Sequence, residues 1–192
     1  AATLFIIFVL LSDIFTLYRK SHRNYLISRE NAIRDPLTRL YNRSYFYDNL
    51  TRQLRTASDR QPVSVLVCDL DYFKRINDTF GHLQGDRVIQ FAADVLQTHA
   101  RKDDVAARIG GEEFALLLVN TTADDAARIA ERIRGAVAVS DPQNLRPSVT
   151  LSLGVYTTSS PQSEAEMCVK RADEAMYQAK ANGRNQVVRW AE

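Results

Sequence analysis

Strand-like and helix-like apolar patterns alternate along most of this 192-residue chain, and that alternation restricts the fold more than any other feature. Five stretches have the composition and spacing of strands: 63–70, 105–109, 114–119, 149–155 and 186–190. Four stretches place apolar residues at helical spacing: 46–54, 88–96, 126–137 and 165–179. Their order predicts an α/β domain, arranged as an α+β sandwich, with a partly antiparallel sheet.

The composition is that of a soluble globular domain, with 45% hydrophobic and 25% charged residues. A net charge of +2 is too small to indicate nucleic-acid binding, so no nucleic-acid partner is expected. The two cysteines, Cys68 and Cys168, are far apart and lack the spacing of metal ligands. Cys68 lies inside an apolar run, which favours a buried, reduced thiol and a reducing compartment.

The first 18 residues are nearly all apolar, interrupted by Asp13 and followed by a basic cluster. A membrane helix needs about 20 such residues, so we interpret residues 1–18 as the C-terminal part of a transmembrane helix of a longer protein. Arg19, Lys20 and Arg23 would then place the rest of the chain in the cytoplasm, at a bacterial inner membrane. A signal peptide fits less well because the charge follows the apolar run. An amphipathic or buried helix is the alternative.

Residues 19–34 are mostly polar and compatible with a helix, with only sparse apolar positions. This pattern predicts a connecting helix or a short coiled coil. The pair Asp35-Pro36 ends it. The main domain is therefore expected to span residues 35–192.

Three carboxylates are expected at one edge of the sheet. Asp69 ends the buried strand 63–70, and Glu112 and Glu113 follow the Gly110-Gly111 turn before the next strand. If these two strands pair, the carboxylates converge, and a hard cation such as Mg²⁺ suits them. Consecutive strand residues face opposite sides, so both glutamates reach one metal only if the turn twists. From the turn alone, a plain hairpin with two solvated glutamates is the alternative.

Several segments together resemble the diguanylate cyclase family, the GGDEF domains, here in a GGEEF variant: 110–114 (GGEEF), 69–86 (DLDYFKRINDTFGHLQGD) and 35–43 (DPLTRLYNR). Residues 151–157 and 172–185 resemble the C-terminal blocks of that family, and the resemblance covers about Asp35 to Trp190. Arg39 departs from the family, which often has glycine there. The resemblance implies a mixed sheet wrapped by helices, like a polymerase palm or nucleotidyl cyclase. It also implies condensation of two GTP into cyclic di-GMP and two pyrophosphates.

The resemblance also implies roles for the residues at the sheet edge. Asp69, the backbone carbonyl of Leu70, Glu112 and Glu113 would hold two Mg²⁺ ions, for which Mn²⁺ could substitute. Glu112 would in addition accept the proton of the attacking hydroxyl, while Lys74 would meet the phosphates as a point charge. A solvated lysine on a short helix is the alternative for Lys74.

Further residues of the matching segments would bind the substrate GTP: Tyr72 and Phe73 through their backbone, Asn77, His82, Asp86, Lys180 and Arg184. Asn77 and Asp86 would read the guanine edge, because a carboxylate accepts from its N–H groups and an amide offers both polarities. His82 is expected to order the loop between them. Lys180 and Arg184 would reach the triphosphate, or would otherwise be an ordinary basic helix C-terminus.

A second set of residues matches the inhibitory product site of the family. Arg101 and Asp104 form an RxxD pattern ahead of the Gly110 turn, and Arg128 and Arg132 lie on the following predicted helix. An arginine fork suits the guanine edge and the phosphates of cyclic di-GMP. A solvated loop and a charged helix face are the alternative.

The expected protein is therefore a membrane-tethered, product-inhibited diguanylate cyclase. One domain would hold one GTP, so a homodimer is needed for catalysis. Two alternatives stay open: a non-catalytic module that binds GTP or cyclic di-GMP, and another nucleotidyl transferase on a similar fold. The signal-sensing part is expected before Ala1.

Overall fold

The computed structural model describes residues 15–23, 30, 32–139 and 149–191, in two compact units, Ala1–Arg34 and Asp35–Glu192. In the first unit, residues 15–23 form a helix that exposes Phe15, Leu17 and Tyr18. Within the described ranges, no helix is both long and apolar enough to cross a membrane. Most of the segment interpreted as a membrane helix, residues 1–14, lies outside the described residues, as does much of the predicted connecting helix.

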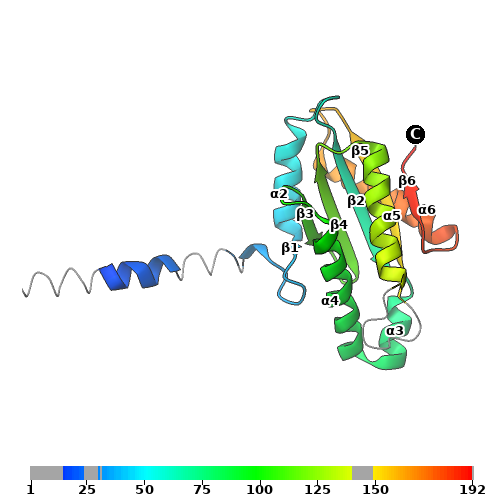
Figure 1. The fold of residues 1–192 in the computed structure, drawn as a ribbon, viewed down its shortest axis with the longest axis horizontal. Helices are drawn as coiled ribbons and strands as arrows, with labels where there is room; N and C mark the ends of the chain where they lie inside the picture. The colour runs from blue at the N-terminus through cyan, green and yellow to red at the C-terminus, as the bar shows by residue number, and fades with distance from the viewer. Residues whose placement is uncertain (1–14, 24–29, 31, 140–148, 192) are drawn as a thin grey trace, which may run out of the picture. The chain divides into compact units, whose positions relative to one another are not determined.

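The second unit is built on a six-stranded mixed sheet (Figure 1). The strands lie in the order β1 (Tyr41–Asn42), β3 (Val105–Arg108), β4 (Glu113–Val119), β2 (Val63–Leu70), β5 (Leu151–Thr158) and β6 (Val187–Arg189). The four central strands pair antiparallel, whereas the short edge strands pair parallel to their neighbours. The predicted mixed sheet is thus confirmed. The sequence did not reveal β1, because two residues carry no measurable periodicity.

Helices cover both faces of this sheet: α2 (Arg43–Leu54), α3 (Phe73–Phe80), α4 (His82–His99), α5 (Ala123–Val139) and α6 (Ala165–Ala181). Alternate residues of β2 enter two separate cores, because strand side chains point to opposite faces. Leu66 and Leu70 pack with α3, α4 and α5, whereas Val65 and Val67 pack with α2 and α6. The sheet is therefore buried on both faces, which leaves its strand ends and connecting turns to form a site.

Both faces of strand β5 are buried, and Ser152 has no exposed surface. A Cβ added to Gly154 would lie 2.0 Å from the carbonyl oxygen of Ala172 and 2.3 Å from the nitrogen of Met176. The small residues of this face therefore admit the backbone of α6 against the sheet.

The segment between β2 and the predicted helical stripe 88–96 is largely helical. It forms α3 and the first turns of α4, with Gly81 at φ 81° between them. The helical pattern was recognised only from Val88 onward, whereas α4 begins at His82. These two helices carry several of the predicted substrate-binding residues.

Candidate active site

The three predicted carboxylates meet at one end of the central strands. Asp69 lies opposite Glu113 in the antiparallel register of β2 and β4. The backbone N–H of Leu70 donates to the carbonyl oxygen of Glu112 at 3.3 Å. Asp69 is buried, with 4% of its surface exposed, while both glutamates are half-buried. Strand pairing thus gathers three negative charges where solvent can screen them only in part.

Lys180 is the ionic partner of Asp69. Its Nζ lies 2.7 Å from Asp69 Oδ1, although that oxygen accepts no hydrogen bond of ordinary geometry from the described residues. Burial raises the pKa of Asp69 to about 6; Lys180 opposes this shift, and the charges of Glu112 and Glu113 add to it. Burial also raises the pKa of Glu112, against the pull of Lys180 and with the help of Glu113. Lys180 therefore balances only part of the negative charge of the three carboxylates.

The Gly110-Gly111 turn is shaped by Glu113. A Cβ at Gly110 would lie 2.1 Å from Glu113 Oε2, whereas one at Gly111 would meet no heavy atom within 4 Å. The N–H groups of Ile109 and Gly110 both donate to the carbonyl oxygen of Glu113, at 3.0 and 3.3 Å. A side chain at the first glycine would therefore displace the Glu113 carboxylate, which folds back over the turn.

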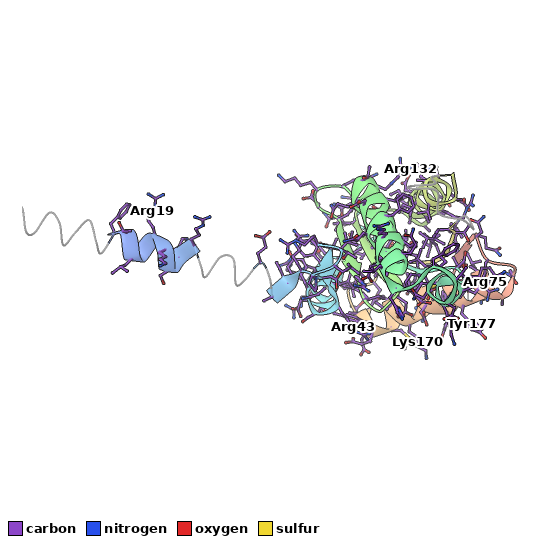
Figure 2. The ribbon with its side chains drawn as sticks, turned by 90° about the horizontal axis from the view of Figure 1, so that it is seen from below. Arg19, Arg43, Arg75, Arg132, Lys170 and Tyr177 are labelled. Atoms are coloured by element: carbon purple, nitrogen blue, oxygen red, sulfur yellow. The ribbon has the colours of Figure 1, made fainter. Side chains whose placement is uncertain are left out.

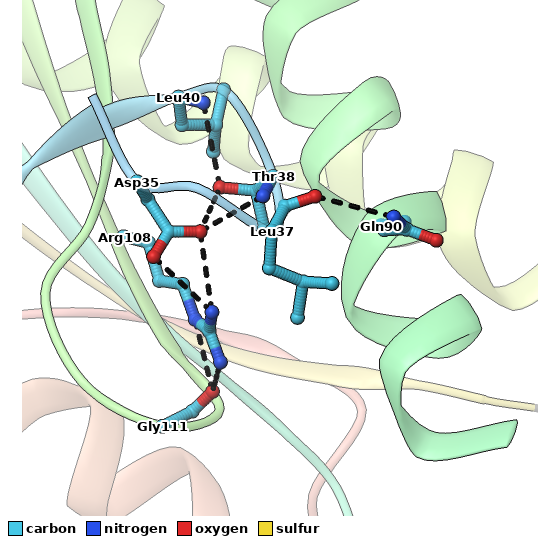
Figure 3. Close-up of polar contacts among 7 residues, drawn as sticks. All are labelled: Asp35, Leu37, Thr38, Leu40, Gln90, Arg108 and Gly111. Atoms are coloured by element: carbon cyan, nitrogen blue, oxygen red, sulfur yellow. Dashed lines mark hydrogen bonds and ion pairs between the residues drawn. The ribbon is translucent and has the colours of Figure 1, made fainter. Parts of the chain in front are cut away.

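Arg108 holds this turn from the other side (Figure 3). Its Nε and Nη2 donate to the carbonyl oxygen of Gly111 at 3.2 and 2.7 Å, and its Nη1 contacts both carboxylate oxygens of Asp35 at 3.2 and 3.3 Å. Thr38 donates to Asp35 Oδ1 through its N–H and its hydroxyl, at 2.8 and 2.7 Å. Burial raises the pKa of Asp35, but the hydrogen bonds from Thr38 and Arg108 outweigh it and hold the pKa below its usual value. The segment before β1 is thereby tied to the turn, a role that the sequence did not reveal for Arg108.

The predicted base-reading residues lie on α3 and at the start of α4. The Asn77 side chain lies against the backbone of Gly85, and its Oδ1 is buried without a hydrogen-bond partner in the described structure. Asp86 follows Gly85 and is exposed, as are His82 and Lys74. The structure thus places Asn77 and Asp86 on adjoining turns, with the Asn77 amide oxygen packed against Gly85.

The predicted cations at the end of α6 and in the loop after it reach the same end of the sheet. Lys180 pairs with Asp69, as described above, and the Arg184 guanidinium carbon lies 4.5 Å from the ring centroid of Tyr72. Tyr72 has φ 57° and precedes Phe73, the first residue of α3. These contacts argue against the alternative of an ordinary basic helix C-terminus, because Lys180 and Arg184 both lie over residues of the β2–α3 segment.

The second predicted set gathers elsewhere. Arg101, Arg128 and Arg132 line one cavity of about 490 Å³, and the Arg132 side chain stands on the outer surface of α5 (Figure 2). Asp104 is buried and directed to the backbone: its Oδ2 accepts from the N–H of Arg101 at 2.8 Å, and its Oδ1 accepts from Val119 at 3.2 Å. Arg101 and Arg132 are exposed beside this cavity, whereas Arg128 pairs with Asp125 on the same helix, and Asp104 shapes the turn that carries Arg101.

Within the described ranges, no three side chains of His, Cys, Asp or Glu stand close enough together to form a ready metal site. Asp69 nevertheless fits a cation, since its Oδ1 is buried without a hydrogen bond and two like charges lie beside it. Lys180 supplies that positive charge in this structure. A divalent ion would replace or supplement it.

The family model "Diguanylate cyclase, GGDEF domain" matches residues 32–186. The chain is 40% identical over 166 residues to the probable diguanylate cyclase DgcT of Escherichia coli and 43% identical over 183 residues to the response regulator PleD of Caulobacter vibrioides. These matches cover 84% and 88% of this chain but only 36% and 40% of those proteins.

A solved structure of the coiled coil and GGDEF domain of DgcB from Caulobacter crescentus, in complex with c-di-GMP, is also similar. The TM-score is 0.86 at 32% identity, covering 93% of this chain and 96% of that one. The structure of diguanylate cyclase SiaD with its activator SiaC, from Pseudomonas aeruginosa, matches with a TM-score of 0.77 at 36% identity. That match covers 93% of this chain and 70% of the other.

Proposed function

The chain belongs to the diguanylate cyclase family of GGDEF domains, and we propose on that premise that it condenses two GTP into cyclic di-GMP and two pyrophosphates. The observation that supports this most is the juxtaposition of Asp69, Glu112 and Glu113 at the strand ends, with Lys180 of α6 against Asp69. A non-catalytic receptor would have no use for such a set of carboxylates. The same activity requires two nucleotides, so two copies of the chain must face each other.

Asp69, the carbonyl of Leu70, Glu112 and Glu113 would hold Mg²⁺, two ions in the family's arrangement, with Mn²⁺ as a substitute. When bound, the metal would screen the phosphate charge and lower the pKa of the attacking 3′-hydroxyl. Glu112 would accept the proton of that hydroxyl, because burial raises its pKa toward the range in which a carboxylate is an effective base. Glu113 lies against Gly110 and would shape the turn beside the nucleotide.

The remaining residues would bind GTP. Asn77 and Asp86 would read the guanine edge, and His82 would order the turn between them. Lys74 and Arg184, with backbone groups around Tyr72 and Phe73, would contact the triphosphate. Lys180 would shift its charge from Asp69 to the phosphates once a divalent cation neutralises the carboxylates.

Glu112→Gln tests the catalytic assignment. We expect it to abolish formation of cyclic di-GMP from GTP and Mg²⁺, because a neutral amide cannot accept the proton, while the circular dichroism spectrum stays unchanged. Glu166→Gln, an exposed glutamate in the first turn of α6, is the matched control and should behave as wild type. Chromatography of the products from GTP, ATP and their mixture distinguishes this activity from that of another nucleotidyl transferase. Unchanged turnover in Glu112→Gln would refute the assignment.

The cavity lined by Arg101, Arg128 and Arg132 would bind the product and inhibit the enzyme. Arg101→Ala should then relieve inhibition by added cyclic di-GMP, whereas Lys102→Ala, beside it on the same exposed turn, should leave it intact. An identical inhibition curve for Arg101→Ala would exclude this site.

Residues 1–18 would tether the domain to the bacterial inner membrane, with the catalytic unit in the cytoplasm. Their apolar sequence and the basic cluster after it support this proposal. Membrane fractionation of the chain with and without residues 1–18 tests it: recovery of both forms in the soluble fraction would exclude the tether.

A further inference from the structure

Asp71 lies just after β2, two residues from Asp69, and its carboxylate is fully engaged. It is 3% exposed and accepts from the hydroxyls of Thr150 and Ser152, both at 2.6 Å, and from the backbone N–H of Asn185 at 3.0 Å. Its own N–H donates to the carbonyl oxygen of Thr150 at 2.9 Å. Asp69 has an ionic partner and a raised pKa, whereas Asp71 has three hydrogen bonds. The two neighbouring carboxylates therefore serve different purposes.

The backbone around Asp71 is unusual. Tyr72, Arg184 and Asn185 all adopt left-handed conformations, with φ 57°, 66° and 46°. A residue other than glycine pays of order 1 kcal/mol for this conformation, and the surrounding structure must hold it there. The bond from the Asn185 N–H to the Asp71 carboxylate is such a restraint, because it fixes the residue immediately after Arg184.

The restrained backbone directs the Arg184 side chain. Its guanidinium carbon lies 4.5 Å from the Tyr72 ring centroid, and its Nη1 lies 3.4 Å from the Tyr72 hydroxyl. The N–H of Arg184 donates to the carbonyl oxygen of Ala179, next to Lys180, which pairs with Asp69. Arg184 is thus held at its backbone through Asp71 and at its guanidinium by Tyr72.

We propose that Asp71 is a positioning residue for the triphosphate of GTP, acting through Arg184. Its carboxylate joins the start of β5 and the loop after α6 to the end of β2, so that Arg184 is aligned before the nucleotide arrives. The entropic cost of ordering a long cationic side chain is then met on folding rather than on binding. The inference rests on the proposed function, since it assigns Arg184 to the phosphates.

A double-mutant cycle tests it. Asp71→Asn, which keeps the shape but offers one carbonyl oxygen where the carboxylate offers two, should raise the KM for GTP about tenfold with a smaller effect on kcat. Arg184→Ala should raise the KM at least as much. The double variant should be no worse than Arg184→Ala alone, because Asp71 has no effect once Arg184 is absent.

Measurements of nucleotide affinity test the role of Asp71 independently of the proposed activity. Titration calorimetry with the α,β-methylene analogue of GTP should give a Kd about tenfold weaker for Asp71→Asn than for wild type, while GMP, which lacks the β- and γ-phosphates, should bind both alike. Ser64→Ala is the matched control, since it removes a buried hydroxyl hydrogen bond at the other end of β2 and should change neither value. Thr150→Val, which removes one donor and keeps Asp71, should give a smaller rise of about threefold and serves if Asp71→Asn does not fold.

Three outcomes would overturn the role of Asp71: wild-type affinity for the GTP analogue in both variants, an equal loss for GMP, or additive effects in the double variant. A wild-type chain that binds the analogue but forms no cyclic di-GMP would refute the proposed activity and leave the binding comparison valid.

Discussion

Replacing Gly85 by alanine separates substrate recognition from stability. A Cβ at this position, inside α4, would lie 1.9 Å from Asn77 Oδ1 and 3.1 Å from Phe73 Cζ. Gly135, inside α5, offers a matched control because a Cβ there would meet no heavy atom within 4 Å. Alanine stabilises a helix by about 1 kcal/mol relative to glycine, so both variants should gain the same intrinsic helix stability.

The two variants should differ in function. The atom in the way at Gly85 is the far end of the Asn77 side chain, which can swing aside, so the free energy of unfolding should stay within about 1 kcal/mol of wild type. Once displaced, the Asn77 amide would no longer meet the guanine edge that the proposed function assigns to it. Losing that contact costs about 1 to 2 kcal/mol, which corresponds to a rise in KM for GTP of about fivefold to thirtyfold.

Initial rates of cyclic di-GMP formation against GTP concentration, together with urea unfolding, measure both quantities on the same preparations. We expect a raised KM for Gly85→Ala alone. The free energies of unfolding of both variants should be close to or above that of wild type. Equal KM values for Gly85→Ala and Gly135→Ala would refute the reasoning. If both values rose equally, helix stiffness and not Asn77 would set the KM.

Three further outcomes are expected. Arg108→Ala should lower the free energy of unfolding by about 2 kcal/mol and reduce kcat, because the Gly111 carbonyl and the Asp35 carboxylate both lose their partner. Arg108→Lys should recover only part of each loss, because lysine lacks the planar guanidinium fork. A wild-type free energy of unfolding together with a wild-type kcat for Arg108→Ala would contradict this. The pKa of Asp69 rises from 3.8 to about 6 on folding, so the folded state holds its proton longer and the metal-free chain should lose about 1 to 3 kcal/mol of stability as pH rises from 4 to 6. Denaturation at several pH values checks this slope, which Asp69→Asn should remove. Gly154→Ala should cost at least about 3 kcal/mol, because its Cβ would meet the backbone carbonyl of Ala172, and a melting temperature near that of wild type would disprove the close approach.

The order of the elements was predictable because burial leaves a periodic trace. The strand 63–70 has the bounds predicted from its apolar run, and the helical stripe 165–179 corresponds to α6. Short elements leave no such trace, so β1 and the bounds of α3 were found only in the structure. Helix starts without a capping side chain are equally hard to place: α4 follows Gly81, for which no side-chain cap forms.

The sequence predicts which residues form the site better than it predicts the contacts that they make. Antiparallel pairing of two recognised strands was enough to bring Asp69 beside Glu113. No local pattern distinguishes Asp69, which needs a cation, from Asp71, which bonds to residues about 80 and 114 positions away. The same holds for Arg108 and Asp35, which are 73 positions apart. Such contacts depend on the folded sheet, and a single sequence carries no sign of them.

The edges of the sheet have a consequence for self-association. Strands at an edge usually offer unpaired N–H and C=O groups to a neighbouring molecule, and a long flat edge promotes aggregation. Here the outermost strands, β1 and β6, have two and three residues, and each lies alongside a longer strand. Little backbone is thereby left for another chain to extend. If two copies face each other as proposed, these short edges protect them from joining edge to edge.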